Sequence, residues 1–221
     1  MLADLPNESS TPTFPTISIS KGIDAVELFI LKSLVPFGRA FKPKSRNEEY
    51  LNSKLVNHLN KGNSPFVFEK DVIKSTTKRK EDIGVYFKES PQIDELPFYV
   101  LEAKRLPTPT SASRDEREYV TGANNDGGIE RFKKELHGCK LKRCGMIGYV
   151  EEKDFSFWHK KINNWIKDLG KNNPDSEVNW KVSEKLNSLT ITDAVAHCDS
   201  THSIKKTSRS IKLFHFWVLF S

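Results

Sequence analysis

The spacing of apolar residues changes from a helical to a strand period soon after residue 60, and this change limits the folds open to the chain. In residues 47–62 (NEEYLNSKLVNHLNKG), Leu51, Leu55 and Leu59 recur every four residues, and Gly62 supplies a stop. This pattern predicts a helix with one buried face.

Three short runs rich in β-forming residues follow, and each predicts a strand. After them come a long polar segment, expected to be a mobile surface loop, then a helix bounded by glycines and a further strand. The expected elements are strands at 64–73, 82–87 and 97–104, the loop at 105–126, the helix at 127–138 and the strand at 144–150. The order helix, three strands, helix, strand predicts an α/β (or α+β) fold, in which helices flank a mixed central sheet.

The residues before this core, which spans about 47–150, are expected to contribute little more than one helix. Residues 1–22 are rich in Ser, Thr and Pro without periodicity, which favours a flexible or peripheral segment. The apolar stretch 26–37 predicts a short helix that ends near Pro36. We therefore expect one domain over residues 23–221.

The residues after the core are interpreted as C-terminal additions to the same domain, residues 151–221. An amphipathic helix is expected at 154–170, with Trp158, Ile162, Trp165 and Ile166 facing inward. Further strands are expected from residue 178 onward. The last apolar run, LFHFWVLF, is far below the roughly 18 residues needed to cross a bilayer, so we interpret it as a buried strand and expect no membrane partner.

Charge and cysteine content indicate the setting of the protein. Lys and Arg exceed Asp and Glu by six among 221 residues, and the sequence pI is about 9.1. A basic chain favours a polyanionic partner such as nucleic acid. The three cysteines are an odd number, and no secretory leader pattern precedes them, so a reduced, cytoplasmic setting is expected.

Two charges at the end of the strand 97–104 (PFYVLEAK) carry the functional signal. Because side chains alternate along a strand, Glu102 and Lys104 share one face. If 82–87 folds back on this strand as a hairpin, Asp82 lies across from residues 102–104. A register one residue away from perfect symmetry brings Asp82 to the same face. Two close carboxylates repel, and a hard divalent cation such as Mg²⁺ is their natural bridge.

Further groups at this point match metal-assisted phosphodiester hydrolysis. Lys104 is placed to orient or deprotonate a water and to offset charge on a phosphate oxygen, while a metal polarises the phosphoryl group. Glu48 lies three residues before Leu51, on the same face as the leucine stripe, and supplies a third carboxylate. Two plainer interpretations stay open: an exposed ion pair for Glu102 and Lys104, and a solvated helix acid for Glu48.

This combination resembles the restriction-endonuclease-like nucleases, the PD-(D/E)XK superfamily, whose signature is an Asp followed at a distance by Glu-x-Lys. Asp82 and Glu102-Ala103-Lys104 match that signature, and the expected order of elements is similar to the family's αβββαβ core. Glu48 falls where many members carry a helix acid. The Pro that usually precedes the Asp is absent, and Glu81 stands there, which leaves Glu81 as an alternative to Asp82.

The resemblance, which covers about half of the chain, implies an activity and a cofactor. Asp82, Glu102 and Glu48 would hold Mg²⁺, with Mn²⁺ as an alternative ion, and Lys104 would serve the attacking water. The implied protein is an endodeoxyribonuclease acting on double-stranded DNA in restriction or foreign-DNA defence, as a homodimer or as a subunit of a larger complex. The alternatives are a non-catalytic nucleic-acid or protein-binding module on the same fold, and an RNA-directed nuclease.

Basic side chains near these residues are candidate phosphate contacts, with a solvated basic face as the alternative. They are Arg131, Lys133 and Lys134 on the expected helix 127–138, and Lys78 and Arg79 in the turn before Asp82. Histidines and cysteines such as His137 and Cys139 fit no strong zinc spacing, so zinc is not expected.

Overall fold

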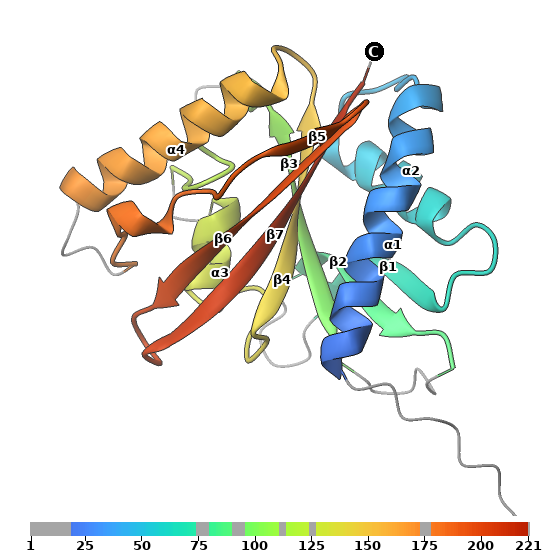
Figure 1. Ribbon diagram of the computed structural model, residues 1–221, viewed down its shortest axis with the longest axis horizontal. Helices are drawn as coiled ribbons and strands as arrows, with labels where there is room; N and C mark the ends of the chain where they lie inside the picture. The colour runs from blue at the N-terminus through green and yellow to red at the C-terminus, as the bar shows by residue number, and fades with distance from the viewer. Residues whose placement is uncertain are drawn as a thin grey trace, which may run out of the picture.

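A seven-stranded mixed sheet with helices on both faces forms the fold (Figure 1). The computed structural model describes residues 19–73, 80–89, 96–110, 114–123, 127–172 and 178–220. The strands lie in the order β1-β2-β3-β4-β7-β6-β5. Their bounds are β1 (Phe66–Ile73), β2 (Lys80–Phe87), β3 (Tyr99–Leu106), β4 (Arg143–Val150), β5 (Thr190–Thr192), β6 (Val195–Ile204) and β7 (Arg209–Leu219).

The direction of the strands divides the sheet into three parts. The three central strands, β3, β4 and β7, run parallel to their neighbours in this group. The pairs β1–β2, β2–β3, β5–β6 and β6–β7 are antiparallel. The expectation of a mixed sheet is confirmed, and the chain adds its last strand beside β4, next to the core that the sequence predicts.

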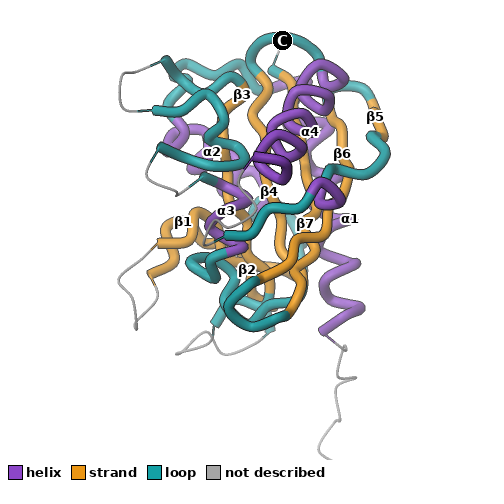
Figure 2. Tube along the Cα trace, turned by 90° about the vertical axis from the view of Figure 1, so that its left-hand side faces the viewer, coloured by secondary structure: helices purple, strands orange, loops and turns teal. Residues whose placement is uncertain are grey.

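Helices cover the two faces of the sheet in pairs. On one face lie α1 (Ile19–Ala40) and α2 (Glu48–Leu59), and on the other α3 (Gly128–Lys133) and α4 (Phe155–Asn172). In the turned view, α4 lies in front of the strands and α1 behind them (Figure 2). Each pair closes its own apolar cluster, because the central strands are apolar on both faces. Within the described part of the chain, every helix is too short or too polar to span a bilayer.

The helix α2 agrees closely with its prediction. Asn47 caps it, accepting a hydrogen bond from the Glu49 backbone N–H through Oδ1 at 2.8 Å. Leu51, Leu55 and Leu59 are fully buried against the sheet, as their four-residue spacing indicates. The cap and the leucine stripe together fix the rotation of the helix, and this places Glu48 in its first turn.

The helix α1 is longer than predicted, and the expected end near Pro36 is wrong. It runs to Ala40 with Pro36 inside it. A proline within a helix costs about 3 kcal/mol or more, because one backbone hydrogen bond is lost. Burial of side chains on both sides of the proline outweighs that cost at roughly 1.5–3 kcal/mol each. These buried side chains are Val26, Ile30, Leu34 and Phe37.

The segment after β3 is not the mobile surface loop that its polar composition predicts. Tyr119 and Val120 in its described part are fully buried. The Tyr119 hydroxyl lies 2.8 Å from His215 Nδ1 and accepts a hydrogen bond of 2.8 Å from Trp217 Nε1, both on β7. Two buried side chains therefore anchor a mostly polar segment in the core, and the partners of Tyr119 lie 96 and 98 positions away in sequence, where local composition gives no information about them.

The helix α3 is shorter than the expected 127–138. It ends at Lys133, after which Glu135 and Gly138 adopt positive φ angles of 54° and 57°. Residues in this left-handed region cannot continue a right-handed helix. The chain therefore turns, and His137 comes back toward the sheet.

Candidate active site

Asp82 lies where strands β2 and β3 separate. Their antiparallel pairing runs from Val85–Tyr99 to Ile83–Leu101, which corresponds to the register that sets Asp82 against Glu102. Beyond that last pair, Asp82 Oδ2 accepts a hydrogen bond of 2.9 Å from the Ala103 backbone N–H. The carboxylate thus continues the contact between β2 and β3 at Ala103 and lies beside Glu102 and Lys104.

Glu102 is a fully buried carboxylate held by three basic side chains. Its Oε1 lies 2.8 Å from Lys104 Nζ and accepts a hydrogen bond of 2.8 Å from Arg131 Nη1. His137 Nδ1 lies 2.7 Å from Glu102 Oε2, within ion-pair distance but without the angles of a hydrogen bond. Arg131 of α3 and His137 of the turn after it therefore both contact this carboxylate.

Glu48 completes the cluster from the other face of the sheet. It lies in the first turn of α2, and its Oε1 is 3.4 Å from Lys104 Nζ. The Lys104 ammonium is almost fully buried between Glu102 and Glu48. The structure thus brings Asp82, Glu102, Lys104 and Glu48 together from three elements that are far apart in the sequence.

The site electrostatics separate the carboxylates into two kinds. Burial and the charge of Glu102 raise the pKa of Asp82 well above its usual range, and Lys104 only partly opposes them. Burial also raises the pKa of Glu48, again against Lys104. Burial alone would raise the pKa of Glu102, but the charges of Lys104, His137 and Arg131 outweigh it and lower that pKa. A bound cation would therefore favour the ionised forms of Asp82 and Glu48, whereas Glu102 already lies against the charges of Lys104 and Arg131.

The lysine is held in its charged form. Burial would lower the pKa of Lys104, but the carboxylates of Glu102, Glu48 and Asp82 outweigh burial and raise it. A protonated ammonium donates hydrogen bonds and cannot accept a proton. Of the two roles considered for Lys104, orienting a water and deprotonating it, this environment favours the first.

The carboxylates fit a divalent cation by one observation of their own. Glu48 Oε2 is buried and has no hydrogen-bond partner, and Glu102 Oε2 has only the ion-pair contact with His137. Buried acceptors without partners are costly, and an oxygen-binding ion such as Mg²⁺ would satisfy them. As the side chains stand, however, no three His, Cys, Asp or Glu in the described ranges form a group arranged to hold a metal ion. Binding would require Lys104 or Arg131 to shift on Glu102.

The alternative acid, Glu81, is directed elsewhere. It is buried, and its Oε1 accepts a hydrogen bond of 2.9 Å from the Gly138 backbone N–H, in the turn after α3. The pairing register and this contact support Asp82 as the acid of the cluster. Glu81 instead stabilises the turn that carries His137.

The basic side chains predicted to contact phosphate have different surroundings. Arg131 is bound to Glu102, and Lys134 lies 3.3 Å from Glu130. Lys133 does not fit the prediction, because its Nζ is buried and donates to both oxygens of Glu184 at 2.8 and 2.7 Å. It is a structural lysine in this fold. The other two predicted contacts, Lys78 and Arg79, lie outside the described residues.

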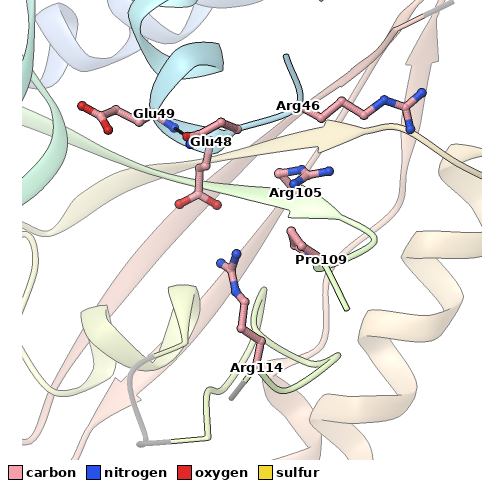
Figure 3. Close-up of a pocket in the computed structure, with 7 residues that line it drawn as sticks. Arg46, Glu48, Glu49, Arg105, Pro109 and Arg114 are labelled. Carbon is pink, nitrogen blue, oxygen red and sulfur yellow. Dashed lines mark hydrogen bonds between the residues drawn. The ribbon is translucent and has the colours of Figure 1, made fainter. Parts of the chain in front are cut away.

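A pocket of about 600 Å³ opens beside the acidic cluster, between the start of α2 and the segment after β3 (Figure 3). Glu48 belongs to both the pocket and the cluster. The remaining lining residues are Arg46, Asn47, Glu49, Arg105, Pro109 and Arg114. None of the three arginines belongs to a motif that the sequence reveals.

His137 and the arginines of the pocket were missed because their roles depend on tertiary placement. A signal for Arg105 existed, since it directly follows Glu-x-Lys on the same strand. The sequence indicates His137 only as a candidate zinc ligand, and nothing local indicates that the turn after α3 returns it to Glu102. Comparison of the chain with protein-family models, curated proteins and solved structures gave no significant match.

Proposed function

We propose that this protein is a Mg²⁺-dependent nuclease that hydrolyses phosphodiester bonds, with DNA as its substrate. One observation carries the proposal: Asp82, Glu102 and Glu48 converge on the buried ammonium of Lys104. The order α2-β1-β2-β3-α3-β4 supports it, because it resembles the αβββαβ core of restriction-endonuclease-like nucleases. That resemblance favours an endodeoxyribonuclease of restriction or foreign-DNA defence.

Each residue of the cluster has a role that follows from its surroundings. Asp82, Glu102 and Glu48 would hold the ion, which supplies a Lewis acid for the phosphoryl oxygen and a water of lowered pKa. Lys104 donates hydrogen bonds, so it orients the attacking water and stabilises negative charge on the phosphate. Asp82 also holds β3 at Ala103, between Glu102 and Lys104. Arg131, part of whose side chain is exposed, is placed to meet the incoming phosphate.

A second candidate function is a nucleic-acid-binding module without catalysis. It is favoured by the charge balance at Glu102, which is already compensated by Lys104, Arg131 and His137. In that case the carboxylates would stabilise the fold and the basic groups alone would meet phosphate.

Nicking of supercoiled plasmid in Mg²⁺ or Mn²⁺ separates the two functions. The nuclease is expected to nick DNA, and Asp82→Ala is expected to abolish nicking while the variant remains folded by circular dichroism. A wild-type protein that binds plasmid in both ions without nicking would establish the binding module instead. RNA offered at matched salt tests whether DNA is the preferred polymer.

A further inference from the structure

We propose that the pocket beside Glu48 binds a phosphate of the nucleic-acid strand, the neighbour of the phosphate that lies at the acidic cluster. The inference rests on the proposed function for the identity of the ligand as a nucleic acid. It adds a binding site and a direction for the strand, from Lys104 across Glu48 toward the end of β3.

Three guanidinium groups give this pocket its chemistry, those of Arg46, Arg105 and Arg114. Arginine is always charged, and its planar fork matches the oxygens of a phosphate. Figure 3 shows Arg114 and Glu48 pointing toward one another from opposite sides of the pocket. A group that enters here therefore meets cationic donors next to a carboxylate of the acidic cluster.

Two of the three arginines are each held in place by a carboxylate. Arg105 donates through Nε and Nη2 to Glu151, the Nη2 bond being 2.8 Å. Arg114 donates in the same way to Glu118, with 3.1 Å between Nε and Oε1. Each carboxylate takes the Nε–Nη2 edge of its arginine, and Nη1 carries two further N–H donors. A guanidinium fixed along one edge loses little side-chain entropy when another acceptor arrives.

The third arginine, Arg46, is the most exposed of the group. Arg46 has 61% of its side chain exposed, and its Nη1 lies 3.5 Å from Glu151 Oε2, too far for a strong ion pair. It precedes the N-terminus of α2, so it can close over a phosphate without disturbing the core. Two guanidiniums paired with carboxylates and one exposed guanidinium can together bind a single anionic group.

The position of the pocket selects the neighbouring phosphate over the reacting one. Lys104 and Arg131 already surround Glu102 and do not line the pocket, which Glu48 joins to the acidic cluster. A strand with its reacting phosphate at Lys104 passes Glu48 and reaches the arginines with the next phosphate. The pocket thus sets which way the backbone crosses the site.

Duplex DNA binding at increasing salt concentration tests this site. Fluorescence anisotropy of a labelled duplex is measured with Ca²⁺, which neutralises the carboxylates, and cleavage is measured separately with Mg²⁺. Arg46→Ala and Arg114→Ala are expected to weaken binding about 10- to 100-fold each. Each is also expected to reduce the slope of log affinity against log salt by about one, because one phosphate contact is lost.

The matched control is Arg39→Ala. Arg39 is an exposed arginine paired with Asp193, outside the pocket, so the variant removes the same charge and the same kind of ion pair. It is expected to keep the wild-type affinity and slope. Melting temperatures show that each variant is folded, and Arg46→Ala keeps the test valid if loss of the Arg114–Glu118 pair destabilises the other variant.

The possible outcomes separate this inference from the proposed function. Weaker binding and a smaller slope in the arginine variants support the site, whether or not the wild type cuts DNA, and an uncut substrate then overturns only the nuclease. Unchanged affinity and slope in both variants overturn the site even if the wild type cleaves. A wild type that neither binds nor cuts overturns both.

Discussion

At the scale of single residues, Lys104 decides what the acidic cluster can do. Its ammonium lies between Glu102 and Glu48, and the surrounding carboxylates raise its pKa. It is therefore a permanent cation in a buried site. Removing the charge leaves Glu102 with its other two partners, Arg131 and His137, so the fold keeps part of its compensation while the water and the phosphate lose their donor.

Lys104→Met, which keeps the length of the side chain and removes the charge, is expected to slow plasmid nicking by about 100- to 1000-fold. A preorganised donor to a developing negative charge is typically worth that much. Lys70→Met is the control, because Lys70 also lies on a strand and pairs with acids but belongs to the edge strand β1. Nicking by Lys104→Met at the wild-type rate would remove Lys104 from the mechanism.

The residues of the cluster differ in how far the sequence reveals them. Strand alternation and the Glu-x-Lys spacing point to Glu102 and Lys104, and the helix period places Glu48. Asp82 follows only if the hairpin has the right register, which depends on a loop whose length does not fix it. His137 gives no usable signal, because a turn with two positive φ angles brings it to Glu102.

At the scale of elements, α3 is a six-residue helix that depends on its anchor. Lys133 is buried, binds both oxygens of Glu184 and donates 3.0 Å to the Ser203 carbonyl. Its ammonium also lies 4.9 Å from the ring centre of Trp180. This anchor joins α3 to the 3-10 turn η1 (Val182–Glu184) and to β6, and so holds Arg131 of the same helix at Glu102.

Lys133→Met is expected to lower the free energy of unfolding by about 3–5 kcal/mol, because Glu184 would be left buried without its main partner. Urea denaturation followed by circular dichroism measures the change. The double variant Lys133→Met/Glu184→Gln is expected to recover part of the loss, since it removes the uncompensated charge. A single variant as stable as the wild type would contradict the anchor.

The elements also show where local sequence patterns stop being informative. The leucine spacing of α2 and the amphipathic pattern of α4 match the structure, because each helix buries one regular face. The length of α1 was misjudged at Pro36, where packing outweighs propensity. The end of α3 is not predictable locally, because Glu135, an ordinary helix former, takes a left-handed conformation and pairs with the distant Arg209.

At the scale of the whole molecule, a series of contacts between buried polar side chains links segments from distant parts of the sequence. Tyr119 contacts His215, and His215 Nε2 lies 2.8 Å from Ser200 Oγ, which is itself 2.7 Å from His202 Nε2. His202 Nδ1 lies 3.6 Å from Glu184 Oε2. This series of contacts therefore connects the segment after β3, strands β7 and β6, and the anchor of α3.

Acid is expected to destabilise the protein by protonating His215 and Glu184 in this series of contacts. Burial lowers the pKa of His215 to about 3, and the neighbouring His202 contributes. A histidine whose pKa is lower in the folded state binds protons more readily when the protein is unfolded. Its contribution to the free energy of unfolding is therefore complete above about pH 6.5 and declines toward pH 3. Glu184 acts at lower pH: burial opposes ionisation, but His202 and Lys133 lower its pKa to about 2, so its contribution declines below about pH 4.5.

The His215 contribution to the free energy of unfolding should therefore fall from pH 7 to pH 4, and urea titration of the wild type and His215→Asn at several pH values measures it as a difference, because the raised pKa values of Asp82 and Glu48 act in the opposite direction in both proteins. His215→Asn is expected to remove this contribution, whatever its effect on overall stability. If the free energies of unfolding of the wild type and the variant change with pH in parallel, His215 is not the source of the pH dependence.

The sequence predicts that the sheet is mixed, but it does not predict the order of the strands. The sequence indicates the strands and a mixed sheet, because short β-forming runs alternate with helical patterns. It does not indicate that β7 pairs in parallel with β4, or that β6 and β5 continue the sheet beyond it. β4 and β7 are separated by about 60 residues, and their apolar faces would fit several neighbours equally well.

The most direct test of the proposed site is the binding of Mn²⁺, followed by the electron paramagnetic resonance signal of the free ion. The wild type is predicted to bind the ion, and Asp82→Asn to bind it at least about tenfold more weakly. Glu81→Gln, which keeps the acceptor for Gly138 N–H, is predicted to bind like the wild type. Equal binding by the wild type and Asp82→Asn, or no binding by the wild type, would contradict a cation site at these carboxylates.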